Sequence, residues 1–154
     1  MTPLLLDPGK EFIDINIAYI EETDKDGVTR FHFIKTPQDK AKWHHCGPIK
    51  MLVTTWRRMT WKDQNYIYSR SMTYIPNDLG FNNLEFDFAK YRDLKLRTCL
   101  KKWNIKDDQD QDISLDNTSI DNLYQEIACE LLDRFEQTTE VTTNVVIRDG
   151  ETIL

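Results

Sequence analysis

The chain has 154 residues, of which 40% are apolar and 30% are charged, with only five Gly and five Pro. These proportions are typical of a single globular domain and exclude the disordered and fibrous classes. The formal net charge of −6 argues against wholesale nucleic-acid binding, because phosphate recognition needs a positive footprint.

No apolar run approaches the length of a membrane-spanning helix, and the first residues lack the basic region of a signal peptide. We therefore expect no membrane partner. The three cysteines, Cys46, Cys99 and Cys129, are odd in number and widely spaced, which argues against a disulfide framework and favours a reducing compartment.

Residues 11–35 are predicted to form a β-hairpin. Apolar residues at 13, 15, 17 and 19 alternate with smaller or polar ones, and Phe31 and Phe33 alternate on the return strand after a polar loop at 21–27. Residues 36–48 are expected to be irregular because they contain two prolines and a glycine. Residues 49–56 are predicted to form a third strand that pairs with the hairpin, with Met51 and Val53 on one face.

Three helices are predicted after the strands. The first begins at the capping pattern Thr60–Asp63 and ends before Pro76, and the second runs from about Phe86 to Trp103. After a polar loop at 106–112, the third begins near Thr118 or Ser119. Apolar residues recur at helical spacing in each segment: Trp61, Tyr68, Met72 and Ile75, then Phe88, Tyr91, Cys99 and Trp103, then Ile120, Leu123, Tyr124, Ile127, Leu131 and Phe135.

The predicted fold class is α+β, with a small N-terminal antiparallel β-sheet followed by a three-helix α region. Residues 1–137 are expected to form one domain, β-rich over 11–56 and helical over 60–137. Residues 138–154 are expected to form a C-terminal arm, with either a strand at 141–147 or a tail that orders on a partner.

Charge is distributed unevenly along the chain. Residues 1–49 carry six basic and eight acidic side chains, residues 50–103 carry eleven and five, and residues 104–154 carry three and thirteen. The basic and acidic zones either face each other within one fold or steer association, with other copies of the chain or with a basic partner.

The candidate metal sites are weak in sequence. His44, His45 and Cys46 resemble zinc ligands, but adjacent side chains usually diverge, and only His32, Cys99 and Cys129 remain to complete a set. Asp108, Asp110 and Asp112 have calcium-loop spacing but lack the Gly and the bidentate Glu that such a loop needs. We expect no metal and no cofactor.

No catalytic residue is predicted either. Cys99 and Cys129 lie on apolar helix faces, where cysteine behaves as a small hydrophobe. The stretch Trp56–Arg58, with Trp61 and Trp103, interleaves aromatic and basic residues as single-strand binders do, although helix-spaced tryptophans are more often core. A phosphate-binding Gly-rich loop, GxSxG and HExxH are absent, so we expect a protein that is not an enzyme.

The order of segments over residues 50–136 is similar to that of a known group. Residues 59–65 (MTWKDQN) open a helix, and residues 88–92 (FAKYR) run into residues 95–104 (KLRTCLKKWN). After an acidic loop, Ile113 and Ser114 lead to residues 119–123 (SIDNL), and a helix ends with residues 129–132 (CELL). This pattern resembles the tail assembly chaperones of tailed bacteriophages and related small tail proteins.

The resemblance implies a non-enzymatic role in the host cytoplasm during phage assembly. Such chaperones bind the long helical tape-measure protein and keep its apolar stretches soluble until the tail tube polymerises around it. The partner-binding residues expected are Trp61, Tyr68, Tyr91, Trp103, Tyr124 and Phe135, which count as core first and as partner surface only where they are exposed.

Two other roles stay open. The protein could be a permanent virion subunit of the tail, neck or baseplate, with residues 141–154 donated as a strand to a neighbouring subunit, including another copy in a homo-oligomer. It could also be an inhibitory or binding module that presents its acidic face to a basic surface.

Overall fold

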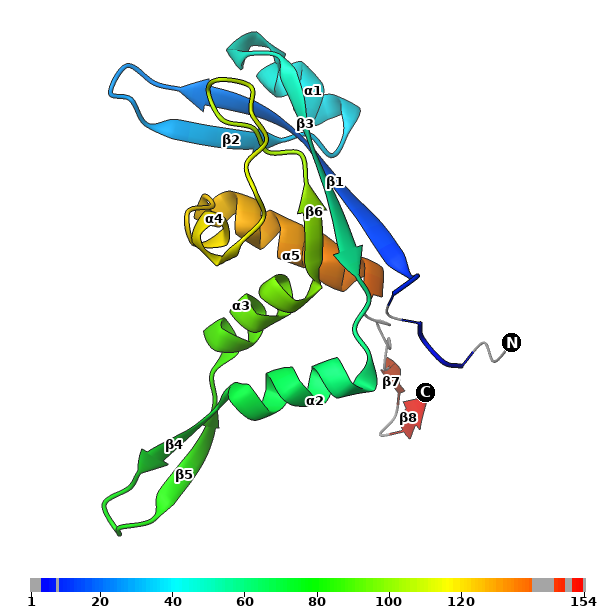
Figure 1. Cartoon of the computed structure of the whole chain (residues 1–154), viewed down its shortest axis with the longest axis vertical. Helices are drawn as coiled ribbons and strands as arrows, with labels where there is room; N and C mark the ends of the chain where they lie inside the picture. Colours follow the sequence, from blue (N-terminus) through cyan, green and yellow to red (C-terminus); the bar gives the residue numbers. More distant parts are fainter. Residues whose placement is uncertain (1–3, 8, 140–145, 149–150, 154) are drawn as a thin grey trace.

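A four-stranded antiparallel sheet dominates one end of the computed structural model, which describes residues 4–7, 9–139, 146–148 and 151–153 (Figure 1). Its strands are β1 (Phe12–Thr23), β2 (Thr29–Phe33), β3 (Ile49–Arg57) and β6 (Leu100–Trp103), in the order β2-β1-β3-β6. The predicted hairpin and third strand are confirmed, since β1 pairs antiparallel with both β2 and β3. Together with five α-helices among the described residues, the sheet confirms the α+β class.

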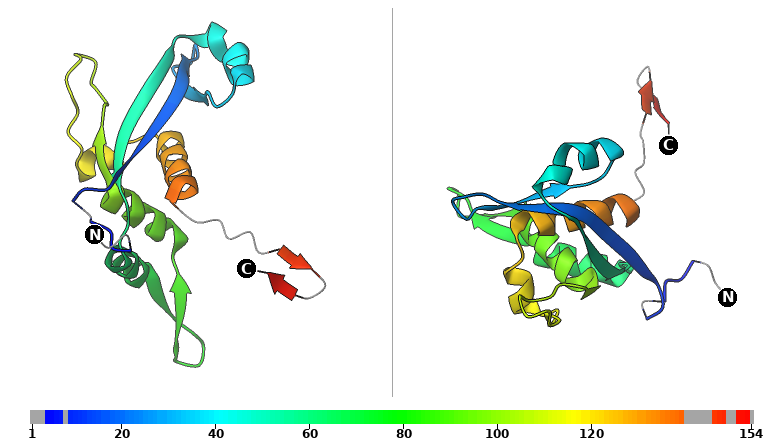
Figure 2. Two further views of the ribbon diagram at one scale, coloured as in Figure 1. Left: turned by 90° about the vertical axis from the view of Figure 1, so that its right-hand side faces the viewer. Right: turned by 90° about the horizontal axis from the view of Figure 1, so that it is seen from above.

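One face of the sheet packs against α5 (Gln125–Thr139) and the C-terminal end of α3 (Phe88–Cys99), as Figure 2 shows for α5. At the centre, Trp56 of β3 stacks on Phe135 of α5, with ring centroids 4.5 Å apart. Met51 and Val53 share a face as predicted, but both are exposed, and the residues that face the core from β3 are Leu52, Thr54 and Trp56. Buried Thr54 is satisfied because its hydroxyl donates to the Ile15 carbonyl and accepts from the Trp56 indole.

Residues 36–48 are largely helical, so the expectation of an irregular segment is wrong. They form α1 (Pro37–Trp43) and a 3₁₀ turn, η1 (His44–Cys46). Thr36 and Asp39 form a reciprocal capping box, which satisfies backbone donors at the start of α1. Pro37 stands in the first turn, where the missing N–H costs nothing.

The first predicted helix is shorter than expected. The capping box of Thr60 and Asp63 opens α2 (Trp61–Arg70) as predicted, but Ser71 closes the helix by donating its N–H and hydroxyl to the Ile67 carbonyl. Residues 72–76, placed on this helix by their spacing, form β4 (Met72–Pro76), which pairs with β5 (Asn82–Phe86). The turn between them is fixed by the Asn77 side chain, which accepts two backbone N–H groups.

The second predicted helix is a helix followed by a strand in the structure, and the third is two helices. The helix that begins after the Asp87 cap is α3, and residues 100–103 leave it to become β6, which pairs with β3. The segment after Asp116 forms α4 (Asn117–Asp121) and then α5, so Ile120 and Leu123 precede the long helix rather than extend its face. The polar loop predicted at 106–112 is present, and Lys106 and Asp112 form an isolated antiparallel β-bridge across it.

The predicted strand at 141–147 lies mostly outside the described residues. Its last two residues belong to β7 (Val146–Arg148), which pairs with β8 (Glu151–Ile153). None of the described helices has the length and apolar character needed to span a bilayer.

The basic and acidic zones contact each other within the fold. From α3, Arg92 reaches Asp133 at 2.8 Å, Lys95 reaches Glu136 at 3.4 Å and Arg97 pairs with Asp121. For the charges of α3, α4 and α5, the interpretation that the basic and acidic zones face each other within one fold therefore applies.

Candidate functional site

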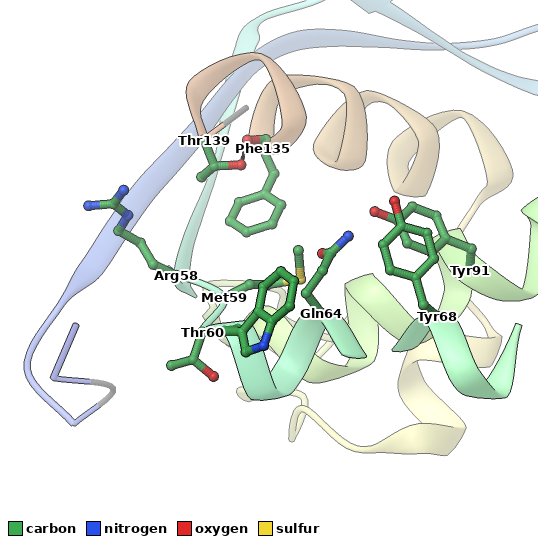
Figure 3. A pocket seen from close by; sticks show the side chains of 9 residues that line it. Arg58, Met59, Thr60, Gln64, Tyr68, Tyr91, Phe135 and Thr139 are labelled. Carbon is green, nitrogen blue, oxygen red and sulfur yellow. Dashed lines mark hydrogen bonds between the residues drawn. The ribbon is translucent and has the colours of Figure 1, made fainter. Parts of the chain in front are cut away.

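A groove lined by aromatic side chains lies between α2, α3, α5 and the β4–β5 hairpin. It consists of two adjoining hollows of about 570 and 520 Å³. The first, shown in Figure 3, is lined by Arg58, Met59, Thr60, Trp61, Gln64, Tyr68, Tyr91, Phe135 and Thr139. The second is lined by Tyr68, Met72, Phe86, Phe88, Tyr91, Lys95 and Glu136. Because Tyr68 and Tyr91 line both, we treat the hollows as one site, the aromatic groove.

Tyr91 is the centre of the aromatic contacts in this groove. Its ring stacks on Tyr68 at a centroid distance of 5.3 Å, and the rings of Phe86 and Phe88 lie 5.4 and 6.2 Å away. These rings come from α2, β5 and α3, so the groove exists only because the chain reverses through the hairpin between the two helices. Aromatic pairs at these separations stabilise one another beyond the area they bury.

The walls of the groove expose much of their apolar surface. Trp61 is 80% exposed and Tyr68 is 43% exposed, whereas Tyr91 and Phe135 form the floor at 8% and 1%. Figure 3 shows Phe135 reaching down from α5 toward α2, with Gln64 and Tyr68 rising from α2 on the other side. Exposed apolar surface of this kind is a candidate site for protein interaction.

The charged groups next to the groove are paired. Arg57 donates two hydrogen bonds to the Asp63 carboxylate, at 2.6 and 3.1 Å. This guanidinium, helped by the N–H and hydroxyl of Thr60, lowers the pKa of Asp63 to about 2. In the second hollow, the ammonium of buried Lys95 lies 4.6 Å from the centre of the Tyr91 ring and contacts Glu136.

The described lining of the groove is mostly uncharged and rich in aromatic rings. These described residues include no histidine or cysteine, and their one carboxylate, Glu136, contacts Lys95 and Arg92. The lining residues provide apolar rings, two methionines and hydrogen-bonding groups at the margin.

The structure divides the six predicted partner-binding residues between two places. Trp61, Tyr68, Tyr91 and Phe135 meet in the aromatic groove, where Tyr91 and Phe135 belong to the core and Trp61 and Tyr68 are exposed. Trp103 and Tyr124 line a separate hollow of about 690 Å³. Tyr124 is exposed there, whereas half-buried Trp103 donates its indole N–H to the Ile113 carbonyl at 2.7 Å.

Sequence reasoning missed the hairpin that completes the groove. We call residues 72–86 the hairpin arm: all ten residues of β4 and β5 are exposed, and Leu79 and Phe81 at its turn are 81% and 70% exposed. Figure 1 shows the arm extending away from the rest of the molecule. The strand signal available in the sequence is the run Thr73-Tyr74-Ile75, followed by a turn that contains Asn77 and Gly80.

The other candidate residues have structural surroundings. Burial raises the pKa of the Cys99 thiol to about 12, so this sulfur is no nucleophile at neutral pH. Trp56 is buried and Arg57 is held by Asp63, so residues 56–58 do not present an interleaved basic and aromatic surface. Asp108, Asp110 and Asp112 lie in the loop that Asp107 organises by accepting two backbone N–H groups.

Comparison of the chain with protein-family models, with curated proteins and with solved structures found no match.

Proposed function

We propose that the protein binds an apolar segment of another protein in the aromatic groove and catalyses no reaction. The observation that carries the proposal is the exposure of Trp61, Tyr68 and Phe88 around a floor of buried aromatic rings. Leaving such surface in water is unfavourable by roughly 25 cal/mol per Å². A partner that covers it recovers that free energy on binding.

The occupant we propose is an amphipathic helix with acidic residues beside its apolar stripe. A groove between helices accepts a helix through anchors at i, i+3, i+4 and i+7. Arg58 lies at the margin of the first hollow with its side chain 52% exposed, and its guanidinium is 3.5 Å from the Glu11 carboxylate. An exposed cation at the rim favours acidic residues on the partner and speeds its association.

Residues 50–136 resemble phage tail assembly chaperones, and on that resemblance the client we propose is the tape-measure protein of the same phage. A tape-measure protein is long, helical and apolar in stretches, which is the chemistry that the aromatic groove accepts. The protein then acts in the host cytoplasm and leaves when the tail tube assembles.

Co-expression with the tape-measure protein tests this function. The double variant Trp61→Ala/Tyr68→Ala removes two exposed walls of the groove, and we expect the amount of tape-measure protein that co-purifies to fall at least about 30-fold, as for two interface anchors. Tyr66→Ala is the matched control, since Tyr66 is an exposed tyrosine of α2 that does not line the groove. Equal co-purification with both variants would contradict the proposal.

A permanent virion subunit is a second candidate, favoured by the hairpin arm. A two-stranded hairpin is only marginally stable alone in water, and this one exposes Tyr74, Leu79 and Phe81. Contact with a neighbouring copy of the chain in an assembled ring would cover these side chains. Quantitative mass spectrometry separates the two roles: a chaperone is abundant in the lysate and missing from mature particles, whereas a subunit is present in particles in fixed proportion.

A further inference from the structure

Three metal-binding side chains converge at the end of the molecule far from the aromatic groove. They are Glu22 of β1, His32 of β2 and Cys46 of η1. One carboxylate oxygen, one imidazole nitrogen and the thiol sulfur all lie within 4.8 Å of one another. These are three of the ligand types that zinc prefers.

Strand register places the first two ligands. Ile20 pairs with His32 and Glu22 pairs with Arg30, so Glu22 and His32 are diagonal neighbours on one face of the hairpin. The imidazole Nε2 of His32 lies 2.9 Å from the carboxylate of Glu22.

The third ligand is brought in by the segment that enters β3. Strand β3 starts opposite β1 with the pair Ile20 and Ile49, which holds η1 against the same strand. Gly47 lies against β1, since a Cβ there would be in ordinary van der Waals contact with the Glu21 carbonyl oxygen, at 3.4 Å. Cys46 is thereby held next to Glu22, and its Sγ also lies 3.4 Å from the Nε2 of His45.

The surroundings of the cluster orient its histidine. The ring of Trp43 stacks on the His32 imidazole, with centroids 3.6 Å apart and planes 8° from parallel. His32 is largely buried and Glu22 is about one-third exposed, so an ion can enter from solvent.

We propose that Glu22, His32 and Cys46 bind one zinc ion, with water at the fourth position of the tetrahedron. The thiolate and carboxylate neutralise the two charges of the ion, and the imidazole binds as a neutral donor. Binding replaces the hydrogen bond between His32 and Glu22 and the contact of Cys46 with His45, and the thiol proton of Cys46 passes to solvent.

Such an ion would link three elements of the fold. Its ligands come from β1, β2 and η1, so it fastens the hairpin to the turn before β3. Because the three ligands are far apart in the unfolded chain, zinc binds the folded state preferentially and stabilises it by mass action. The site is independent of the function proposed for the aromatic groove, and either can fail without the other.

Titration of the chelator-stripped protein with Zn²⁺ and Co²⁺ tests the site. We expect one equivalent of either ion to bind, the cobalt form to show tetrahedral d–d bands with a thiolate-to-cobalt charge-transfer band, and Zn²⁺ to raise the melting temperature reversibly. No thiolate band and no melting shift would overturn the proposal.

Variants assign the ligands. Cys46→Ser, His32→Gln and Glu22→Gln should each weaken Zn²⁺ binding at least about 100-fold, and Cys46→Ser should abolish the charge-transfer band. His44→Gln and Cys129→Ser are matched controls and should bind as the wild type does. Melting of every variant in chelator distinguishes ligand loss from misfolding. Unchanged Zn²⁺ affinity in a folded Cys46→Ser variant would also overturn the proposal.

Discussion

Tyr68 of α2 stacks on Tyr91 of α3 with ring centroids 5.3 Å apart and planes 29° from parallel. One ring is 43% exposed and the other is 8% exposed, so a single contact joins the surface of the aromatic groove to the core beneath it. Both tyrosines are predicted partner-binding residues, but their different burial gives them different roles. Tyr91 supports the groove, and Tyr68 is available to a partner.

Substitution of each tyrosine separates these two roles. We expect Tyr91→Ala to lower the free energy of unfolding by about 3 kcal/mol, because it leaves a cavity beside Phe86 and Phe88. Tyr68→Ala should lower it by about 1 kcal/mol or less, since half of its ring is already in water. Urea unfolding followed by circular dichroism measures both, and equal losses would show that the groove floor is misassigned.

The Arg57–Asp63 pair predicts a dependence of stability on acid. The folded pKa of Asp63 is about 2, below the ordinary value of 3.8, so the ionised carboxylate stabilises the fold fully above about pH 4. This contribution, about 1–2 kcal/mol, is lost as the pH falls from about 4 through 2. Asp63→Asn should therefore be less stable than wild type at pH 7, and the difference should shrink at pH 2.5.

Asp39→Asn is the control for the acid prediction. Asp39 occupies the same capping-box position in α1, but there is no arginine beside it, and Lys35 and Thr36 supply backbone hydrogen bonds. Asp39→Asn should change the pH dependence of the free energy of unfolding less than Asp63→Asn does. A larger effect at Asp39 would contradict the assignment to the Arg57 pair.

The exposure of the hairpin arm predicts that substitutions at its turn change solubility without changing the free energy of unfolding. Leu79 and Phe81 contact little of the domain, so Leu79→Ser/Phe81→Ser should leave the free energy of unfolding within about 0.5 kcal/mol of wild type. The variant should aggregate less and bind less of a hydrophobic dye, because two large apolar side chains are removed from water. A marked loss of stability would mean that the arm packs on the domain.

Cysteine reactivity tests the burial of α3. Cys99 is buried and its thiol pKa is raised to about 12 by desolvation, whereas Cys46 and Cys129 are half-buried. In native protein at pH 8, iodoacetamide should modify Cys129 well before Cys99, whose labelling should require unfolding. Mass spectrometry of the labelled peptides gives the order of labelling. Early labelling of Cys99 would mean that this face of α3 is exposed to solvent, which would contradict the packing described here.

The sequence predicts local elements well where one period dominates. Alternation at residues 13–19 and the capping pattern at Thr60 both identify elements that the structure confirms. Residues 72 and 75 also fit helical spacing by coincidence, and the strand-forming Thr73 and Tyr74 between them decide the outcome. The Thr36–Asp39 spacing fits a capping box, and Pro37, which punctuates the sequence like a helix breaker, stands in the first turn of α1, where proline is tolerated.

Pairing between strands that are far apart in the chain could not be predicted from the sequence. Residues 100–103 continue a helical pattern, and they become β6 because the edge of β3 is open to them. Glu22, His32 and Cys46 stand ten and fourteen residues apart in no motif spacing, so only the strand register brings them together. The aromatic groove likewise depends on a hairpin whose strands pair across a turn.

Site-specific photocrosslinking in phage-producing cells tests the central claim most directly. A photoreactive phenylalanine analogue placed at Trp61 lies in the groove, and the same analogue at Tyr66 lies outside its lining on the same helix. The account predicts a crosslink from position 61 to an apolar segment of the tape-measure protein and none from position 66. Crosslinks from position 61 to a second copy of this chain, or equal crosslinking from both positions, would contradict it.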